Sequence, residues 1–441
     1  MAHSNHAVAN SHSLHRQLWQ LAIPVMLSNI SVPLLGLVDT AILGHLDDSR
    51  YLAAVAMGTS LFTFVFWSFA FLRMGTTALV AQHYRNAHAL TGVLQSAVLL
   101  AASIGCVLWI MAPWIIEVLL YLVDAVADIS PLSQDYLSIR FYIAPVSLLN
   151  YVALGYLIGL GHTRATLIIL VTTNVLNGLL NYAFVYGLHL NSNGVAYASN
   201  LAEIFQLILA VLFIRPRLLD SAAWHLAKTQ LKHFMQLNVQ LFIRTFLLLF
   251  TFAFFMSKGA QHSAVLLSAN AILINLLMFI SNALDGFAVA SESLVGKALA
   301  DKNQTRIKAI ILASGQWSCI FALGFSFILW IAHEPIVHLL TSQEAVLNLL
   351  TQLQYWLIFL PLAGFACYWL DGIFIGLAAG REMRDSVMVG LFILFLPLEY
   401  LFQSWTYHGL WLALFAFLLG RAAWQLITLP KIMQRNANSF T

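Results

Sequence analysis

Long apolar runs are the feature that most restricts how this chain can fold. Segments such as 96–116 and 242–256 are apolar around most of a helix, whereas soluble helices carry one apolar stripe. Of the 441 residues, 61% are hydrophobic and 9% are charged, against about 25% charged residues in an average soluble domain. Too few charges remain to cover a water-facing surface. The sequence therefore predicts an all-α integral membrane protein.

The apolar runs are long enough to cross a membrane as helices. A bilayer core of ~30 Å is crossed by ~20 apolar helical residues, which gives about twelve transmembrane helices here. A membrane β-barrel would need ~10-residue segments of alternating polarity, and these runs do not alternate. We expect spans at 18–44, 52–83, 91–113, 136–160, 165–187, 194–214, 233–257, 263–297, 307–332, 349–379, 386–405 and 409–430.

The positive charges between the spans predict the orientation. Most Lys and Arg residues lie in the terminal segments and in every second loop, whereas only Arg50 and Lys258 lie in the other loops. Because cytoplasmic loops are enriched in Lys and Arg, both termini are predicted to be cytoplasmic. The resulting division is a cytoplasmic tail at 1–17, an N-lobe at 18–214, a cytoplasmic linker at 215–232, a C-lobe at 233–430 and a cytoplasmic tail at 431–441.

The second half of the chain repeats the first, at an offset of about 216 residues. This repeat predicts two pseudo-symmetric six-helix lobes, with a substrate cavity between them that opens alternately to each side. The matching segments are 20–21 with 236–237, 76–81 with 291–296, 158–160 with 375–377, and 180–182 with 398–400. In the last of these matches, Glu399 aligns with Asn181.

Polar residues at one depth of the N-lobe predict an ion site. A charge at the bilayer centre costs ~3 kcal/mol on insertion scales, so charges inside spans are rare and usually functional. Asp39 lies in the outer part of the first span, and the sixth span carries Ser199 and Glu203 at a similar depth. The fifth span carries amides at spacings of three and four, which place them on one helix face. These amides are Asn174, Asn177 and Asn181.

Burial disfavours the charged form of a carboxylate, so a proton gradient can protonate such a group and allow helices to repack. Pro24 and Pro33 in the first span each remove a backbone hydrogen bond and could provide a bend. The alternative is that Asp39 is a structural acceptor, that the prolines are static kinks, and that the amides only join helices.

The C-lobe also carries charged residues inside its predicted spans. Arg244, Asp285 and Asp371 are predicted to lie at one level, with Glu292 nearer the cytoplasm. The favoured interpretation is that Arg244 pairs with one or both aspartates in a neutralised cluster that holds the lobe together. The alternative is a second cation-binding or substrate-binding site.

The first span also carries a specific pattern, Ile23-Pro24-Val25-Met26-Leu27-Ser28-Asn29-Ile30 followed by 32–40 and 43–46. It resembles the DinF branch of the multidrug and toxic compound extrusion (MATE) family, as do segments 71–74, 174–177, 284–287 and 370–376. The resemblance implies a two-lobed secondary active antiporter, not an enzyme, which exports hydrophobic or cationic drugs in exchange for H+ or Na+. It implies that Asp39 couples the ion, with Asn177, Asn181 and Ser199 as partners.

The same resemblance implies a multi-pass protein of the bacterial cytoplasmic (inner) membrane. Its expected partners are small toxic organic compounds and the lipid bilayer. We expect a monomer with no nucleic-acid partner, no bound cofactor and no metal centre, since the ion is transported rather than resident.

One position departs from the family pattern, because relatives often have an aspartate where this chain has Asn181. Asp39 then lacks an acidic partner on the fifth span, unless Glu203 substitutes. One carboxylate suffices for a proton, whereas Na+ prefers several oxygen ligands that commonly include carboxylates. The sequence therefore favours H+ coupling, with Na+ as the alternative.

Two further functions compete with drug export. A lipid-precursor flippase of the same superfamily would line its cavity with several basic residues, but only Arg73 and Arg244 are expected within the membrane, with Arg140 near one end. An intramembrane enzyme would need a nucleophile–base pair or metal ligands, yet the sequence contains neither His-Glu-x-x-His nor Gly-x-Ser-x-Gly.

Overall fold

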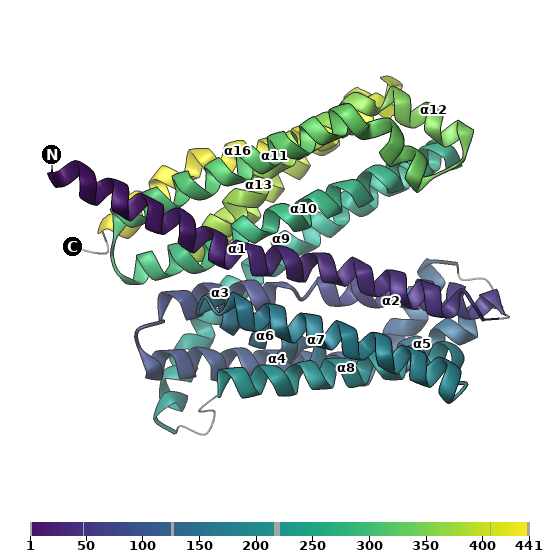
Figure 1. The fold of residues 1–441 in the computed structure, drawn as a ribbon, viewed down its shortest axis with the longest axis horizontal. Helices are drawn as coiled ribbons and strands as arrows, with labels where there is room; N and C mark the ends of the chain where they lie inside the picture. The colour runs from purple at the N-terminus through teal and green to yellow at the C-terminus, as the bar shows by residue number, and fades with distance from the viewer. Residues whose placement is uncertain (1, 47, 125–127, 216–220, 406, 439–441) are drawn as a thin grey trace. The chain divides into compact units, whose positions relative to one another are not determined.

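The computed structural model describes residues 2–46, 48–124, 128–215, 221–405 and 407–438, and only the backbone of 2–12, 32–34, 37 and 221–230. Within these ranges every regular element is a helix (Figure 1). The expected linker at 215–232 and tails at 1–17 and 431–441 therefore fall partly outside the described residues, as does the side chain of Pro33.

The first half of the chain follows the predicted order of helices. Its elements are α1 (Ala2–Leu43), α2 (Ser49–Trp67), α3 (Phe71–Gln82), α4 (Ala87–Leu122), α5 (Ser130–Phe141), α6 (Ala144–Gly159), α7 (Thr163–Tyr182), the π-helix η1 (Ala183–Gly187) and α8 (Asn191–Ile214). Asp48 begins α2 by accepting a hydrogen bond from the backbone N–H of Arg50 at 2.9 Å. The hydrogen bonds from Arg50 lower the pKa of this partly exposed loop carboxylate.

The second half contains α9 (Ser221–His262), α10 (Ala264–Ala300), α11 (Gln304–Leu340), α12 (Glu344–Gln352), α13 (Gln354–Gly376), α14 (Gly380–Met388), the π-helix η2 (Val389–Phe395), α15 (Leu396–Leu401), the short η3 (Gln403–Trp405) and α16 (Tyr407–Asn438). The eleventh predicted span is thus not one straight helix, because α14, η2 and α15 follow one another through it. Helix also continues through the described parts of the segments expected as tails.

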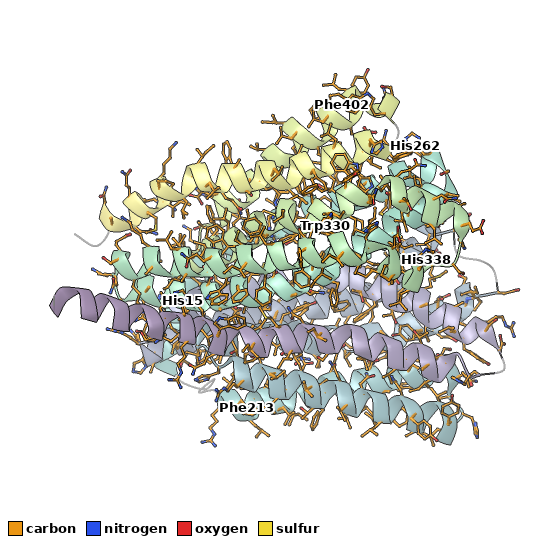
Figure 2. All side chains as sticks on the ribbon, turned by 45° about the horizontal axis from the view of Figure 1, so that its top comes forward. His15, Phe213, His262, Trp330, His338 and Phe402 are labelled. Atoms are coloured by element: carbon orange, nitrogen blue, oxygen red, sulfur yellow. The ribbon has the colours of Figure 1, made fainter. Side chains whose placement is uncertain are left out.

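The described helices confirm the all-α membrane fold. Nine segments in the described ranges are long and apolar enough to cross a membrane, and α5 with α6, bent by 55°, makes a tenth. The remaining two expected spans correspond to α1 and to the α14–η2–α15 segment. Large apolar side chains such as Trp330 and Phe213 are exposed (Figure 2), as is expected of faces in contact with lipid.

The chain divides into two compact units. One, here called the N-terminal unit, comprises Leu27–Met235, and the other, the C-terminal unit, comprises Gln236–Thr441 together with Met1–Met26. In the N-terminal unit α6 packs against α3, α4 and α8, and α7 packs against α8. In the C-terminal unit α13 packs against α10, α11 and α16.

The same helix contact recurs in each unit and supports the internal repeat. A Cβ atom on Gly159 would lie 2.8 Å from both Thr77 O and Val80 Cβ, so α6 and α3 touch through a glycine. A Cβ atom on Gly376 would lie 2.8 Å from Glu292 O and 2.9 Å from Val295 Cβ, where α13 meets α10. The sequence repeat aligns these same residues: Gly159 with Gly376, Thr77 with Glu292, and Val80 with Val295.

The helix ends agree with this repeat. Asn86 accepts a hydrogen bond from Ala89 N at 3.0 Å at the start of α4, and Asn303 accepts one from Arg306 N at 2.9 Å at the start of α11. Such asparagine caps satisfy a backbone donor that the first helical turn leaves open. The two pseudo-symmetric six-helix lobes are therefore visible in local geometry as well as in sequence.

Candidate functional site

A chain of polar side chains joins three helices of the N-terminal unit. Asn181 on α7 donates from Nδ2 to Asp39 Oδ1 on α1 at 2.5 Å, and to Asn177 Oδ1 at 2.8 Å. Asn177 donates in turn to the hydroxyl of Ser199 on α8 at 3.2 Å. The structure thus brings together four of the predicted ion-site residues, and we call them the Asp39 chain.

The helical repeat of α7 explains why this chain can form. Asn177 and Asn181 are four residues apart, so their side chains lie above one another on one face. Both are buried, and Asn181 is 0% exposed. Close by, the Tyr186 hydroxyl of η1 donates to the carbonyl of Ile42 at 2.7 Å and fixes the end of α1 against the end of α7.

The carbonyl oxygen of the Asn181 side chain has no hydrogen-bond partner among the described atoms. A buried acceptor without a donor costs about 1–3 kcal/mol. An amide in this position can rotate and present either its N–H2 group or its oxygen to the carboxyl group of Asp39. The site can therefore satisfy both an ionised and a protonated Asp39.

Asn174 lies one helical turn away from this chain and makes a different contact. Its Nδ2 donates to the hydroxyl of Ser31 on α1 at 2.9 Å. The predicted polar stripe on the fifth span therefore contacts α1 at two levels, at Ser31 through Asn174 and at Asp39 through Asn181.

Pro24 and Pro33 lie within an unbroken α1, which continues from Ala2 to Leu43.

Glu203 belongs to a separate cluster. Its carboxylate accepts a hydrogen bond from Arg140 at 2.5 Å and another from the hydroxyl of Ser147. Asn150 donates to the backbone carbonyl of Glu203 at 3.0 Å. Glu203 is thus already neutralised by an arginine, and none of its recorded hydrogen bonds joins it to the Asp39 chain.

Arg140 is the N-terminal-unit residue that sequence reasoning undervalued. It is 6% exposed, donates to Asn200 Oδ1 at 2.7 Å, and stacks its guanidinium 4.1 Å from the ring centroid of Phe62. Its charge also acts on Asp39. Its burial comes from contacts with α2 and α8, which residues near it in the sequence do not reveal.

The C-terminal unit contains a buried cluster centred on Asp371 of α13. Arg244 of α9 donates to Asp371, and Arg421 and Gln425 of α16 donate to it at 2.8 Å and 2.7 Å. Arg421 is 1% exposed. The expectation that only Arg73 and Arg244 lie within the membrane left out Arg421, which falls inside the predicted span 409–430.

The other two predicted C-lobe acids lie on α10. Glu292 is buried, and Asp285, two helix turns before it, acts electrostatically on Tyr368 of α13. Glu399 of α15 forms an ion pair with Lys258 of α9 at 3.0 Å. An ion pair thus occupies in the second half the place that the Asp39–Asn181 hydrogen bond occupies in the first.

Comparison with known proteins gives a consistent result. The MatE family model matches residues 24–183 and 239–401. The chain is 38% identical over 416 residues to DNA damage-inducible protein F of Escherichia coli (strain K12), covering 92% of this chain and 90% of the relative. It is 24% identical over 437 residues to the probable multidrug resistance protein NorM of Bacillus cereus, covering 95% and 96%.

Solved structures show the same fold. A crystal structure of MATE in the straight conformation superposes with a TM-score of 0.83 and 19% identity, over 96% of both chains. Three residues of the Asp39 chain, Asp39, Asn177 and Asn181, lie within the first family-model segment. Asp371 lies within the second.

Proposed function

This chain belongs to the MatE family of multidrug and toxin extrusion transporters, and from that premise we propose that it exports hydrophobic or cationic compounds in exchange for inward H+. The ion would act by protonating Asp39. The observation that carries the proposal is the composition of the Asp39 chain: one carboxylate, two amides and one hydroxyl.

The partners of Asp39 favour H+ over Na+. Na+ prefers several oxygen ligands, commonly including more than one carboxylate. The other acid at this depth, Glu203, is held by Arg140 and Ser147.

Protonation of Asp39 can reverse the direction of the whole chain. With Asp39 ionised, Asn181 donates to it, and Asn177 donates to Ser199. With Asp39 protonated, its O–H would donate to the open oxygen of Asn181, Asn177 would donate to that same oxygen, and the hydroxyl of Ser199 would donate to Asn177. Each side chain keeps a hydrogen-bond partner in both states. Binding of one proton to Asp39 on α1 would therefore change the hydrogen bond that Ser199 makes on α8.

Transport into proteoliposomes tests the proposal directly. The purified protein is reconstituted and given a pH gradient or a Na+ gradient, one at a time, with a fluorescent lipophilic cation as substrate. We expect the pH gradient alone to drive uptake. Uptake driven by the Na+ gradient alone would overturn the ion assignment, and no uptake with either gradient for a panel of neutral and cationic compounds would overturn the substrate class.

The protein is a multi-pass membrane protein of a bacterial transporter family. We place it in the cytoplasmic membrane with both termini in the cytoplasm, because Lys and Arg gather in alternate loops. A cysteine-accessibility experiment on the loop residue Asp48 and on the C-terminal residue Arg435 tests this: an impermeant reagent added outside intact cells should label only the Asp48→Cys variant.

A further inference from the structure

A cavity of about 870 Å³ lies between α4 and α5 of the N-terminal unit, away from the Asp39 chain. Two features of the helices create it. A Cβ atom on Gly105 of α4 would lie 2.4 Å from Pro145 Cα, so α4 touches the start of α6 closely at that level. Just beyond, the chain bends by 55° between α5 and α6.

The wall that α5 contributes is polar and uncharged. Ser130, Gln134 and Ser138 follow one another at intervals of four residues and line the cavity. The opposite face of α5 is used for packing, since Tyr136 meets the hydroxyl of Thr59 at 2.9 Å. The hydroxyl and amide groups of the cavity wall can donate hydrogen bonds to an anionic oxygen.

The other wall is mainly apolar and carries two acids, Glu117 on α4 and Asp124 just after its end. The remaining α4 residues that line the cavity are Trp109, Ile110, Ala112, Pro113, Ile116, Leu120 and Tyr121. No Lys or Arg is among the described residues that line the cavity.

The level of the cavity along the membrane follows from helix length. Trp109 lies about 27 Å along α4 from residue 91, where the predicted span begins, at about 1.5 Å per residue, which is close to the far end of the ~30 Å hydrocarbon core. Trp109 pairs with Tyr142, their ring centroids 6.2 Å apart. Aromatic residues of this kind gather at the lipid headgroup level, and the exposed α4 residues Ile110 and Trp114 continue the apolar surface from the cavity.

We propose that this cavity binds the headgroup of a zwitterionic phospholipid with a primary ammonium group, as in phosphatidylethanolamine. The ammonium group would meet Glu117 and Asp124, because its N–H donors suit carboxylate acceptors. The phosphate would accept hydrogen bonds from the α5 wall, and the acyl chains would follow the exposed face of α4. Transport of drugs is not required for this binding.

Native mass spectrometry of the full-length protein in detergent tests the assignment. The probes are phosphatidylethanolamine, phosphatidylcholine, whose ammonium has no N–H, and phosphatidylglycerol, which has no ammonium. We expect phosphatidylethanolamine to bind about tenfold more tightly than the other two, the scale of one charge-assisted hydrogen-bond set. The double variant Glu117→Gln/Asp124→Asn should lose this preference.

Asp135→Asn is the matched control, because Asp135 is an exposed acid on α5 that does not line the cavity. It should keep the preference of the unmodified protein. Equal affinity for the three lipids, or the same loss in Asp135→Asn, would overturn the proposal. Displacement of the lipid by tetraphenylphosphonium at similar affinity would instead identify a general site for amphiphilic cations and would overturn the lipid assignment. Unchanged melting of the detergent-solubilised double variant verifies that it is folded.

Discussion

Asn181 on α7 donates a hydrogen bond to Asp39 on α1 at 2.5 Å, and the same nitrogen donates to Asn177 at 2.8 Å. Asn181 is fully buried, so its two contacts replace those it would make with water. An acid on one helix is thereby tied to a second helix and, through Asn177, to Ser199 on a third. In the proposed mechanism, the protonation state of Asp39 determines which direction of this chain is favourable.

Asp39→Asn should abolish transport and leave the protein folded. The substituted amide cannot take up a proton at physiological pH, so the proposed coupling step is lost, whereas the size and polarity of the side chain are retained. Substrate efflux from cells expressing the variant should fall to the level of cells without the protein. Asp48→Asn is the control, because this partly exposed acid lies just past the same helix, and it should retain efflux. Retained efflux in Asp39→Asn would refute the coupling role.

Asn181→Asp should bring Na+ into the transport cycle. The change places a second carboxylate within hydrogen-bond distance of Asp39 and supplies the multiple oxygen ligands that Na+ prefers. At a fixed pH gradient, Na+ should then stimulate or inhibit uptake in the variant and leave the original protein unaffected. If Na+ has no effect on uptake by the variant, the number of carboxylates beside Asp39 does not determine which ion is coupled.

Asn177→Leu should weaken the link between Asp39 and α8 without removing the titrating group. Asn177 is 4% exposed, and a similar volume of apolar side chain leaves the hydroxyl of Ser199 and the amide of Asn181 without this partner. We expect substrate transport to fall more than tenfold. Asp39 should still take up a proton, which is measured through the pH dependence of tryptophan fluorescence. Full transport by this variant would show that the chain is not a relay.

The Asp371 cluster should matter for stability more than for ion choice. Asp371→Asn leaves Arg244 and Arg421 buried without a counter-charge, and loss of one partner of a buried ion pair costs about 3–5 kcal/mol. Arg244→Met leaves Arg421 paired with Asp371 and should cost less, about 1.5–3 kcal/mol for a charged hydrogen bond. Thermal unfolding in detergent should show this order. An unchanged melting temperature combined with a new Na+ requirement would contradict it.

The sequence was sufficient for the helical membrane class, because apolar runs and the scarcity of charge act over whole segments. It also located Asp39, Asn177, Asn181 and Ser199, since an acid and amides inside an apolar helix are visible without a structure. It could not show that Asn174 contacts Ser31 instead, because residues on one helix face can meet different levels of a tilted neighbour.

Two arginines were placed poorly for physical reasons. Arg140 is buried by contacts with Asn200 and Glu203, which lie 60 and 63 residues further along the chain. Arg421 lies inside an apolar run, so its position was visible, but its contact with Asp371 joins residues 50 apart along the chain. Long-range pairing of this kind follows from packing, and the local sequence does not encode it.

Proton movement upon addition of substrate is the most direct test of the central claim. Inverted membrane vesicles are energised in Na+-free buffer, and the internal pH is followed with a fluorescent dye while a lipophilic cation is added. The account predicts that the substrate dissipates the pH gradient in vesicles with the original protein and does not do so with Asp39→Asn. A gradient that stays intact until Na+ is added, or one that collapses equally in Asp39→Asn, would contradict it.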